Sequence, residues 1–139
     1  MNLIYIIIGW FVVFIVILAI FLSWRKRKIE QIIRKMKLSG ETFILEPETA
    51  NYRGASAKYS RIKGNGMVGL TDEKIIFIPF VGKNIIVPIN EIEEVRESKR
   101  FLGQYVGKPI LVLHCTEAEI GFLVKDSRRW QNAIKGVIE

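Results

Sequence analysis

The chain opens with one long apolar run and then changes to short alternating segments. No charged residue occurs between Leu3 and Trp24, a run of 22 residues. A helix rises about 1.5 Å per residue, so the run covers about 33 Å, enough for a bilayer core of roughly 30 Å. The pattern predicts a transmembrane anchor over residues 1–24.

Two other interpretations of this run fit less well. A cleaved signal peptide carries positive charge before its apolar core, whereas here the positive charge follows the run. A buried helix of a soluble protein is usually shorter and has a polar face. The membrane anchor is favoured, with Tyr5 and Trp24 as interfacial aromatic residues near its two ends.

Basic side chains come directly after the apolar run. Arg25, Lys26, Arg27 and Lys28 follow Trp24, and we expect them to contact lipid head groups. Lys and Arg close to a span stay on the cytoplasmic side, and the N-terminal flank carries none. We therefore expect a single-pass protein of the cell membrane, with its N-terminus outside and its C-terminal domain in the cytoplasm.

Apolar positions continue at helical spacing beyond the basic residues. Ile29, Ile32, Ile33 and Met36 follow the i, i+3, i+4, i+7 pattern, which predicts a basic juxtamembrane amphipathic helix over residues 25–40. Two placements of its apolar face are open. The face lies on the membrane surface, or it packs on the domain that follows.

From Thr42 onward, short apolar segments alternate with turn signals, which is typical of strands. The expected strands are residues 43–45, 50–53, 57–62, 67–71, 74–80, 84–89, 95–101, 110–116 and 120–125. We expect turns at Pro47 and at residues 64–66, a helical turn over residues 91–95 and a loop through residues 103–107. A final amphipathic helix begins at Asp126 or Ser127. The pattern predicts a mainly β barrel or sandwich that one helix caps.

One segment resembles a known family. Residues 66–77, GMVGLTDEKIIF, resemble the GRAM branch of the pleckstrin-homology-like (PH-like) superfamily, with a glycine, a strand, Leu-Thr, a polar turn and an apolar run ending in Phe. Residues 86–89 are similar to the family's Ile-Pro-Leu strand, and Phe122 and Trp130 match its late aromatic strand and closing helix. The resemblance covers residues 41–139. It implies a PH-like (GRAM-type) antiparallel β-barrel or sandwich capped by a C-terminal helix, and it implies no single ligand.

The positive charge of the chain lies almost entirely beside the apolar run. The formal net charge is +7, from 21 basic and 14 acidic side chains. Residues 25–37 hold seven basic side chains and one acidic one, a net of +6, which leaves 14 and 13 in residues 38–139, a net of +1. Topology and anionic lipids explain such a basic run. We therefore expect no nucleic-acid partner.

Two motifs suggest chemistry, and both have a simpler explanation. Residues 64–69 fit G-x-G-x-x-G, but a strand is expected after them, whereas a dinucleotide site needs a helix there. His114 and Cys115 are the only histidine and the only cysteine. Neighbours in a strand point to opposite faces, which disfavours a Cys–His nucleophilic pair. Two such ligands also fall short of a usual zinc site.

The remaining candidates are charged side chains. The carboxylates Glu91, Glu93, Glu94 and Glu97 lie close together, but no nucleophile accompanies them, so we expect a solvated acidic face. Lys58, Arg61 and Lys63 lie where the resemblance places phosphate-binding cations of lipid-binding PH domains. They are possible ligand contacts, although the chain lacks a convincing copy of that motif, and an ordinary solvated strand is the alternative.

These observations predict a non-catalytic, membrane-anchored PH-like interaction module. We expect it to recruit or scaffold a protein partner at the cytoplasmic membrane surface, with no cofactor and no metal. The alternative is a reader of anionic or phosphoinositide lipid head groups. Binding of the domain to such liposomes distinguishes the two hypotheses.

Overall fold

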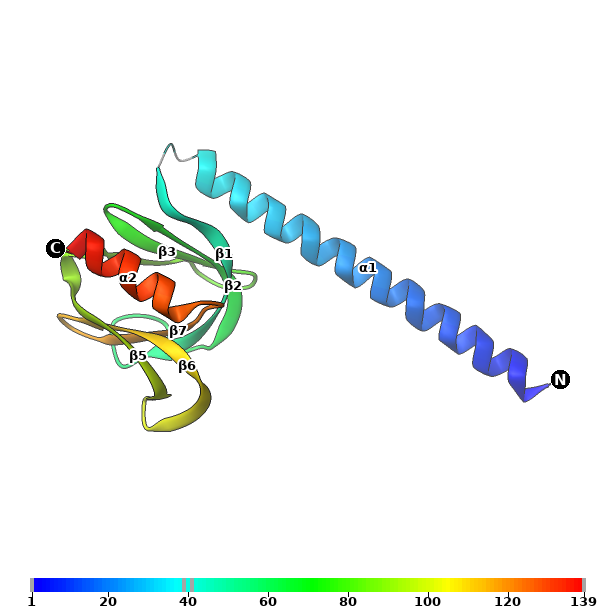
Figure 1. The fold of residues 1–139 in the computed structure, drawn as a ribbon. Coiled ribbons are helices and arrows are strands. Elements are labelled where there is room, and N and C mark those ends of the chain that lie inside the picture. The colour runs from blue at the N-terminus through cyan, green and yellow to red at the C-terminus, as the bar shows by residue number, and fades with distance from the viewer. Residues whose placement is uncertain (1, 39, 41, 139) are drawn as a thin grey trace.

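The computed structural model describes residues 2–38, 40 and 42–138. Its elements in chain order are α1 (Leu3–Leu38), β1 (Phe43–Ala55), β2 (Gly64–Thr71), β3 (Lys74–Pro79), β4 (Ile85–Pro88), the 3-10 helix η1 (Ile89–Glu91), β5 (Ile92–Phe101), β6 (Gln104–Cys115), β7 (Glu119–Leu123) and α2 (Ser127–Ile138). Figure 1 shows α1 running past one side of a curled sheet, with α2 lying across the opening of that sheet. The expected mainly β domain with a capping helix is confirmed.

The strands form a single antiparallel sheet in the order β4-β3-β2-β1-β7-β6-β5. The sheet curls around one core, in which the rings of Tyr52, Phe77 and Phe122 lie with centroids 5.4–5.6 Å apart. Trp130 and Ile134 of α2 enter the same core, and both are 0% exposed. The amphipathic pattern of the last helix therefore predicts its burial correctly.

The helix α1 is continuous across the boundary between its apolar and basic parts. Every residue from Asn2 to Arg27 is exposed, and the apolar part extends clear of the barrel in Figure 1. Among the described residues, α1 is the one helix that is both long enough and apolar enough to cross a bilayer, judged by length and composition. Of the helix expected over residues 25–40, residues 25–38 are helical, as the spacing of the isoleucines predicts. Residue 39 lies outside the described residues, and Gly40 lies in a turn.

Strand β1 is longer than the sequence pattern predicts. We expected two short strands separated at Pro47, but residues 43–55 form one strand. The register between β1 and β2 shifts between Leu45 and Glu48, so Pro47 lies at an irregularity in the pairing. Proline has no backbone N–H to donate, and a bulge tolerates that loss.

The segment after β1 is a loop, and the strand expected over residues 57–62 is wrong. Lys58 has a φ of +66°, a left-handed conformation that an extended strand excludes. The expected turn at residues 64–66 is wrong too, because these residues belong to β2. A Cβ on Gly66 would lie 2.7 Å from Cα of Pro79, so this glycine permits close approach of β3 rather than a turn.

Two further expectations need correction near β5 and β6. The helical turn expected over residues 91–95 is instead η1 at Ile89–Glu91, and β5 already begins at Ile92. The loop expected through Gly103 and Gly107 shrinks to a tight turn, since β6 starts at Gln104. The polar turn that the resemblance implies after Leu70-Thr71 is present: Thr71 Oγ1 accepts hydrogen bonds from the backbone N–H groups of Glu73 and Lys74, at 3.2 and 3.1 Å.

Candidate functional site

The basic half of α1 packs against the outer face of the sheet. Ile32 and Met36 are 5% and 3% exposed, and they share an apolar cluster with Met67 of β2 and Ile76 of β3. Ile29, Ile33, Phe43, Ile78 and Phe80 pack around this cluster. We call this contact the α1 seam. Of the two placements that the sequence left open, the structure favours packing on the domain.

The four basic residues after the apolar run lie at the start of the α1 seam. Arg25, Lys26 and Arg27 are exposed, and Lys28 is half-buried. All four belong to the uninterrupted helix between the apolar run and the barrel. Their contact with lipid head groups stays a prediction.

A surface hollow of about 380 Å³ lies between α1 and the barrel. Three cationic residues line it: Arg25 of α1, Lys108 of β6 and Lys125, which follows β7. Asn51 and Asn65 contribute amide groups, joined by a hydrogen bond from Nδ2 of Asn51 to Oδ1 of Asn65 at 2.9 Å. None of the described residues lining this hollow is acidic. We call it the basic hollow.

Sequence reasoning missed most of the basic hollow. Asn51, Asn65, Lys108 and Lys125 come from four places in the chain that the sheet brings together, and the packing of α1 on the sheet adds Arg25. No spacing within one element signals this arrangement. The sequence offered one signal, which is the charge of the barrel. Its basic and acidic residues nearly balance in number, but the basic ones can gather on a surface that the acidic ones do not share.

Two of the three candidate ligand contacts in the loop between β1 and β2 already bind other side chains of the barrel. Nζ of Lys58 lies 3.0 Å from Glu91 Oε2 and 3.5 Å from Glu117 Oε2, and the Glu91 hydrogen bond raises the pKa of Lys58. Lys63 donates to Oε1 of Gln104 at 3.1 Å, while Arg61 is exposed. Glu91 and Gln104 lie near opposite ends of β5, so Lys58 and Lys63 reach in different directions. Their role in ligand binding stays a prediction.

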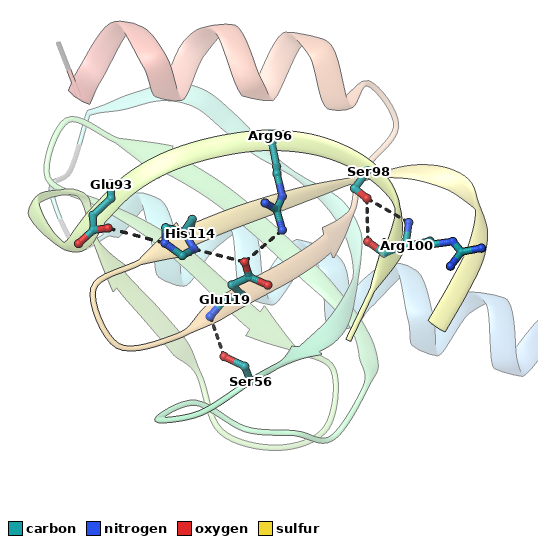
Figure 2. Close-up of polar contacts among 7 residues, drawn as sticks. All are labelled: Ser56, Glu93, Arg96, Ser98, Arg100, His114 and Glu119. Atoms are coloured by element: carbon teal, nitrogen blue, oxygen red, sulfur yellow. Dashed lines mark hydrogen bonds and ion pairs between the residues drawn. The ribbon is translucent and has the colours of Figure 1, made fainter. Parts of the chain in front are cut away.

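The single histidine belongs to a polar cluster on the surface. Figure 2 shows His114 between two carboxylates: Nε2 lies 3.7 Å from Glu93 Oε2, and Nδ1 lies 3.3 Å from Glu119 Oε1. Arg96 also reaches Glu119 Oε1, at 3.1 Å, and the backbone N–H of Glu119 donates to Ser56 Oγ. This cluster ties β5, β6 and β7 together on their outer face.

The single cysteine lies on the opposite face, as expected. Cys115 is 4% exposed and belongs to the main core, and burial, followed by the charge of Glu91, raises the pKa of its thiol to about 11. A thiolate is the reactive form, so this thiol is poorly suited to nucleophilic chemistry near neutral pH. In the described part of the chain, no three His, Cys, Asp or Glu side chains are arranged to hold a metal ion.

Two tyrosines beside the Lys58 loop have raised pKa values. Burial, followed by the nearby Tyr59, raises the pKa of Tyr52 to about 12, and the hydroxyl of Tyr52 donates to the backbone oxygen of Ser60. Burial and then Glu91 raise the pKa of Tyr59 to about 12, and its hydroxyl donates to Glu91 Oε2 at 3.2 Å. Both groups are neutral near pH 7, and they hold the loop to the barrel.

Comparison with known proteins identifies the fold of the barrel. No protein-family profile and no curated protein matches the chain. The N-terminal PH domain of human ARAP2 is 14% identical, and the match covers 68% of this chain and 78% of that one, with a TM-score of 0.50. The barrel has a PH-like fold. The C-terminal domain of an unknown protein from Leishmania infantum is 16% identical over 80% of this chain and 99% of that one, with a TM-score of 0.51.

The PH-like fold also accounts for the G-x-G-x-x-G segment. In this fold residues 64–69 form strand β2, and the polar turn after Thr71 leads into strand β3 rather than a helix. A Cβ on Gly69 would lie 2.8 Å from Cε1 of Phe43, so the third glycine of the segment leaves room for the Phe43 ring. The expectation that this segment is not a dinucleotide site agrees with the strand that follows it.

Proposed function

We propose that this protein is a single-pass membrane protein whose PH-like domain, of the GRAM type over residues 41–139, binds a protein partner at the cytoplasmic surface. One observation carries the proposal. The same helix presents a fully exposed apolar run over residues 3–24 and packs against the barrel through Ile32 and Met36. An exposed apolar surface of this size is unfavourable in water and favourable in lipid.

The proposed topology follows from the basic flank. Residues 25–28 lie directly beyond the apolar run, and by the positive-inside rule this basic flank supports a cytoplasmic position for residues 25–139. Because the α1 seam joins the helix to β2 and β3, the domain is held in one orientation at the membrane. A fixed orientation presents one set of loops and edges to cytoplasmic proteins.

An edge strand of the sheet supports the proposal of a protein partner. Strand β4 is at one end of the sheet order, so among the described residues no strand pairs with one of its sides. Ile86 in this strand is 48% exposed. An exposed edge strand can pair with an extended segment of another protein through backbone hydrogen bonds.

Site-specific photocrosslinking in native membranes tests the proposal. A photoreactive residue at Ile86 should give one saturable protein adduct, whereas the same residue at exposed Asn132 of α2 should not. Ile86→Asp should remove the adduct formed from a photoreactive residue at the neighbouring exposed Asn84, with the domain still folded. Equal, unsaturable labelling at Ile86 and Asn132 would contradict a specific protein partner at this edge.

A lipid head-group reader is the second candidate, and the basic hollow favours it. The hollow gathers three cations without a lining carboxylate, directly beside the end of the apolar run. Cationic side chains and amide N–H groups are suitable donors for phosphate oxygens. A protein-binding role at the β4 edge and a lipid contact at the hollow use different surfaces, so both can operate in one molecule.

A further inference from the structure

The basic hollow is built from both parts of the molecule. Arg25 comes from α1, while Lys108 and Lys125 come from the barrel, so the hollow is incomplete without the packed helix. The α1 seam at Ile32 and Met36 holds the two parts together. The position of the barrel relative to the apolar run therefore decides what can reach the hollow.

The three cations of the hollow have no carboxylate partner in the part of the chain that the structure describes. No ion pair joins Arg25, Lys108 or Lys125 to an acidic side chain among the described residues. By contrast, Lys58 and Arg96 on other surfaces of the barrel are paired with glutamates at 3.0 and 3.1 Å. Unpaired cations that converge on one hollow produce a positive potential that attracts an anion.

The level of the hollow along α1 indicates where the anion comes from. Arg25 is the first residue after the apolar run, and it lines the hollow with Lys108 and Lys125. If residues 3–24 fill the hydrocarbon core, Arg25 lies in the head-group layer, which extends the bilayer to about 40–45 Å overall. The hollow then opens at the depth of the lipid phosphates.

The positive surface continues beyond the hollow along the outer face of β1. Arg53 lies two residues from Asn51, so both side chains belong to the same face of the strand. Nη1 of Arg53 lies 3.4 Å from Oδ1 of Asn51, and its buried Nε has no hydrogen-bond partner. The acidic residues Glu91, Glu93 and Glu97 lie in η1 and β5, and none of these three lines the hollow.

We infer that the basic hollow seats the phosphate of an anionic lipid head group from the same membrane that α1 enters. Lys108 and Lys125 supply ammonium donors, Arg25 supplies its guanidinium from the helix, and the amide of Asn65 lies beside them. The inference rests on the proposed membrane anchoring. It names a site made jointly by the anchor helix and the outer face of the barrel, separate from the loop that carries Lys58, Arg61 and Lys63.

Hydrogen–deuterium exchange of the full chain in nanodiscs tests the inference. The chain is compared in discs of phosphatidylcholine, in discs that also contain phosphatidylserine, and in phosphatidylcholine discs with added inorganic phosphate. We expect slower exchange in the segments around Lys108 and Lys125 in the phosphatidylserine discs alone. At about 1 kcal/mol for each basic residue near anionic lipid, two lysines correspond to roughly a thirtyfold difference in affinity for the anionic lipid.

A double substitution and a matched control decide whether the hollow is responsible. Lys108→Gln with Lys125→Gln should abolish the slowing, whereas Lys99→Gln with Lys135→Gln removes the same charge from β5 and α2 and should preserve it. Unchanged exchange in the core segment 111–113 verifies that the double variant is folded.

Each contrary outcome has a distinct meaning. Equal exchange in all discs, or slowing that survives Lys108→Gln with Lys125→Gln, overturns the lipid site while the anchoring stands. Slowing by inorganic phosphate alone assigns the hollow to a free anion and overturns the lipid source. Failure of the chain to incorporate into any disc overturns the membrane anchoring, and the inference with it.

Discussion

Ile32 of α1 and Met67 of β2 share one buried apolar cluster, with 5% and 2% of their surfaces exposed. This relationship joins the helix that carries the apolar run to the PH-like barrel. Without it, no apolar contact of these residues would fix the barrel relative to the helix. With this contact, one helix both carries the apolar run proposed to enter the membrane and fixes the position of the domain relative to that run.

Breaking the α1 seam should expose Met67 to solvent. Ile32→Asp places a charge in an apolar cluster, and loss of a buried isoleucine alone typically costs about 2–5 kcal/mol. We therefore expect peroxide to oxidise Met67 at least about tenfold faster in this variant. Mass spectrometry of the full chain in nanodiscs measures the rate. The control is Gln31→Asp on the exposed side of the helix, where no change is expected.

Two glycine substitutions should have opposite effects on stability. Gly69→Ala adds a Cβ 2.8 Å from the ring of Phe43, and overpacking a buried site typically costs about 1–3 kcal/mol. Gly136→Ala adds a Cβ with no atom within 4 Å in helix α2, where alanine is favoured over glycine by about 1 kcal/mol. Thermal unfolding should show a lower midpoint for the first and a higher one for the second. Equal midpoints would contradict the close packing of Phe43 on β2.

The hydrogen bond that joins α2 to β1 should be measurable by substitution. Trp130 Nε1 donates to Glu48 Oε1 at 2.8 Å, and Trp130 is fully buried. Trp130→Phe removes the donor and leaves Glu48 without it, which should lower the free energy of unfolding by about 1–3 kcal/mol. Glu48→Gln keeps an acceptor oxygen and should cost less. Chemical denaturation of the two variants tests this order, and a larger loss in Glu48→Gln would contradict it.

Cys115 should make stability depend on pH at alkaline values. Its thiol pKa rises from an ordinary 9.0 to about 11 in the folded protein, because burial disfavours the thiolate. The neutral thiol is thus favoured on folding, so its contribution is complete below pH 9 and is lost as pH rises from 9 towards 11. Cys115→Val should flatten this part of the stability profile. An identical decline in stability between pH 9 and 10 in both proteins would exclude the Cys115 thiol as its cause, since Tyr52 and Tyr59 titrate at higher pH.

The sequence was most informative where one periodic pattern decides the structure. The run ending at Trp24, the isoleucine spacing before Gly40 and the stripe of Trp130 and Ile134 all correspond to helices in the structure. Periodicity reports which face of an element is apolar, but not what covers that face. For this reason the helix containing Ile32 was predictable, while its packing on β2 was not.

Expectations failed where contacts distant in sequence decide the local conformation. Gly66 was expected in a turn, but its role is to let Pro79 approach β2 closely. Lys58 was expected in a strand, but its left-handed backbone and its pairing with Glu91 belong to a loop. The basic hollow is lined by residues from six separate segments that come together only in the folded chain, so no local motif predicts it.

The central claim is that α1 anchors a cytoplasmic PH-like domain in the membrane. Labelling with a membrane-impermeant maleimide tests it most directly, using Asn2→Cys or Val81→Cys in a Cys115→Val background. Val81 is 85% exposed on the barrel, so a cysteine there is accessible to the reagent. The account predicts that both variants stay in the membrane fraction after alkaline washing, with Asn2→Cys labelled in intact cells and Val81→Cys labelled only after permeabilisation. Recovery of the chain in the soluble fraction, or labelling of Val81→Cys in intact cells, would contradict it.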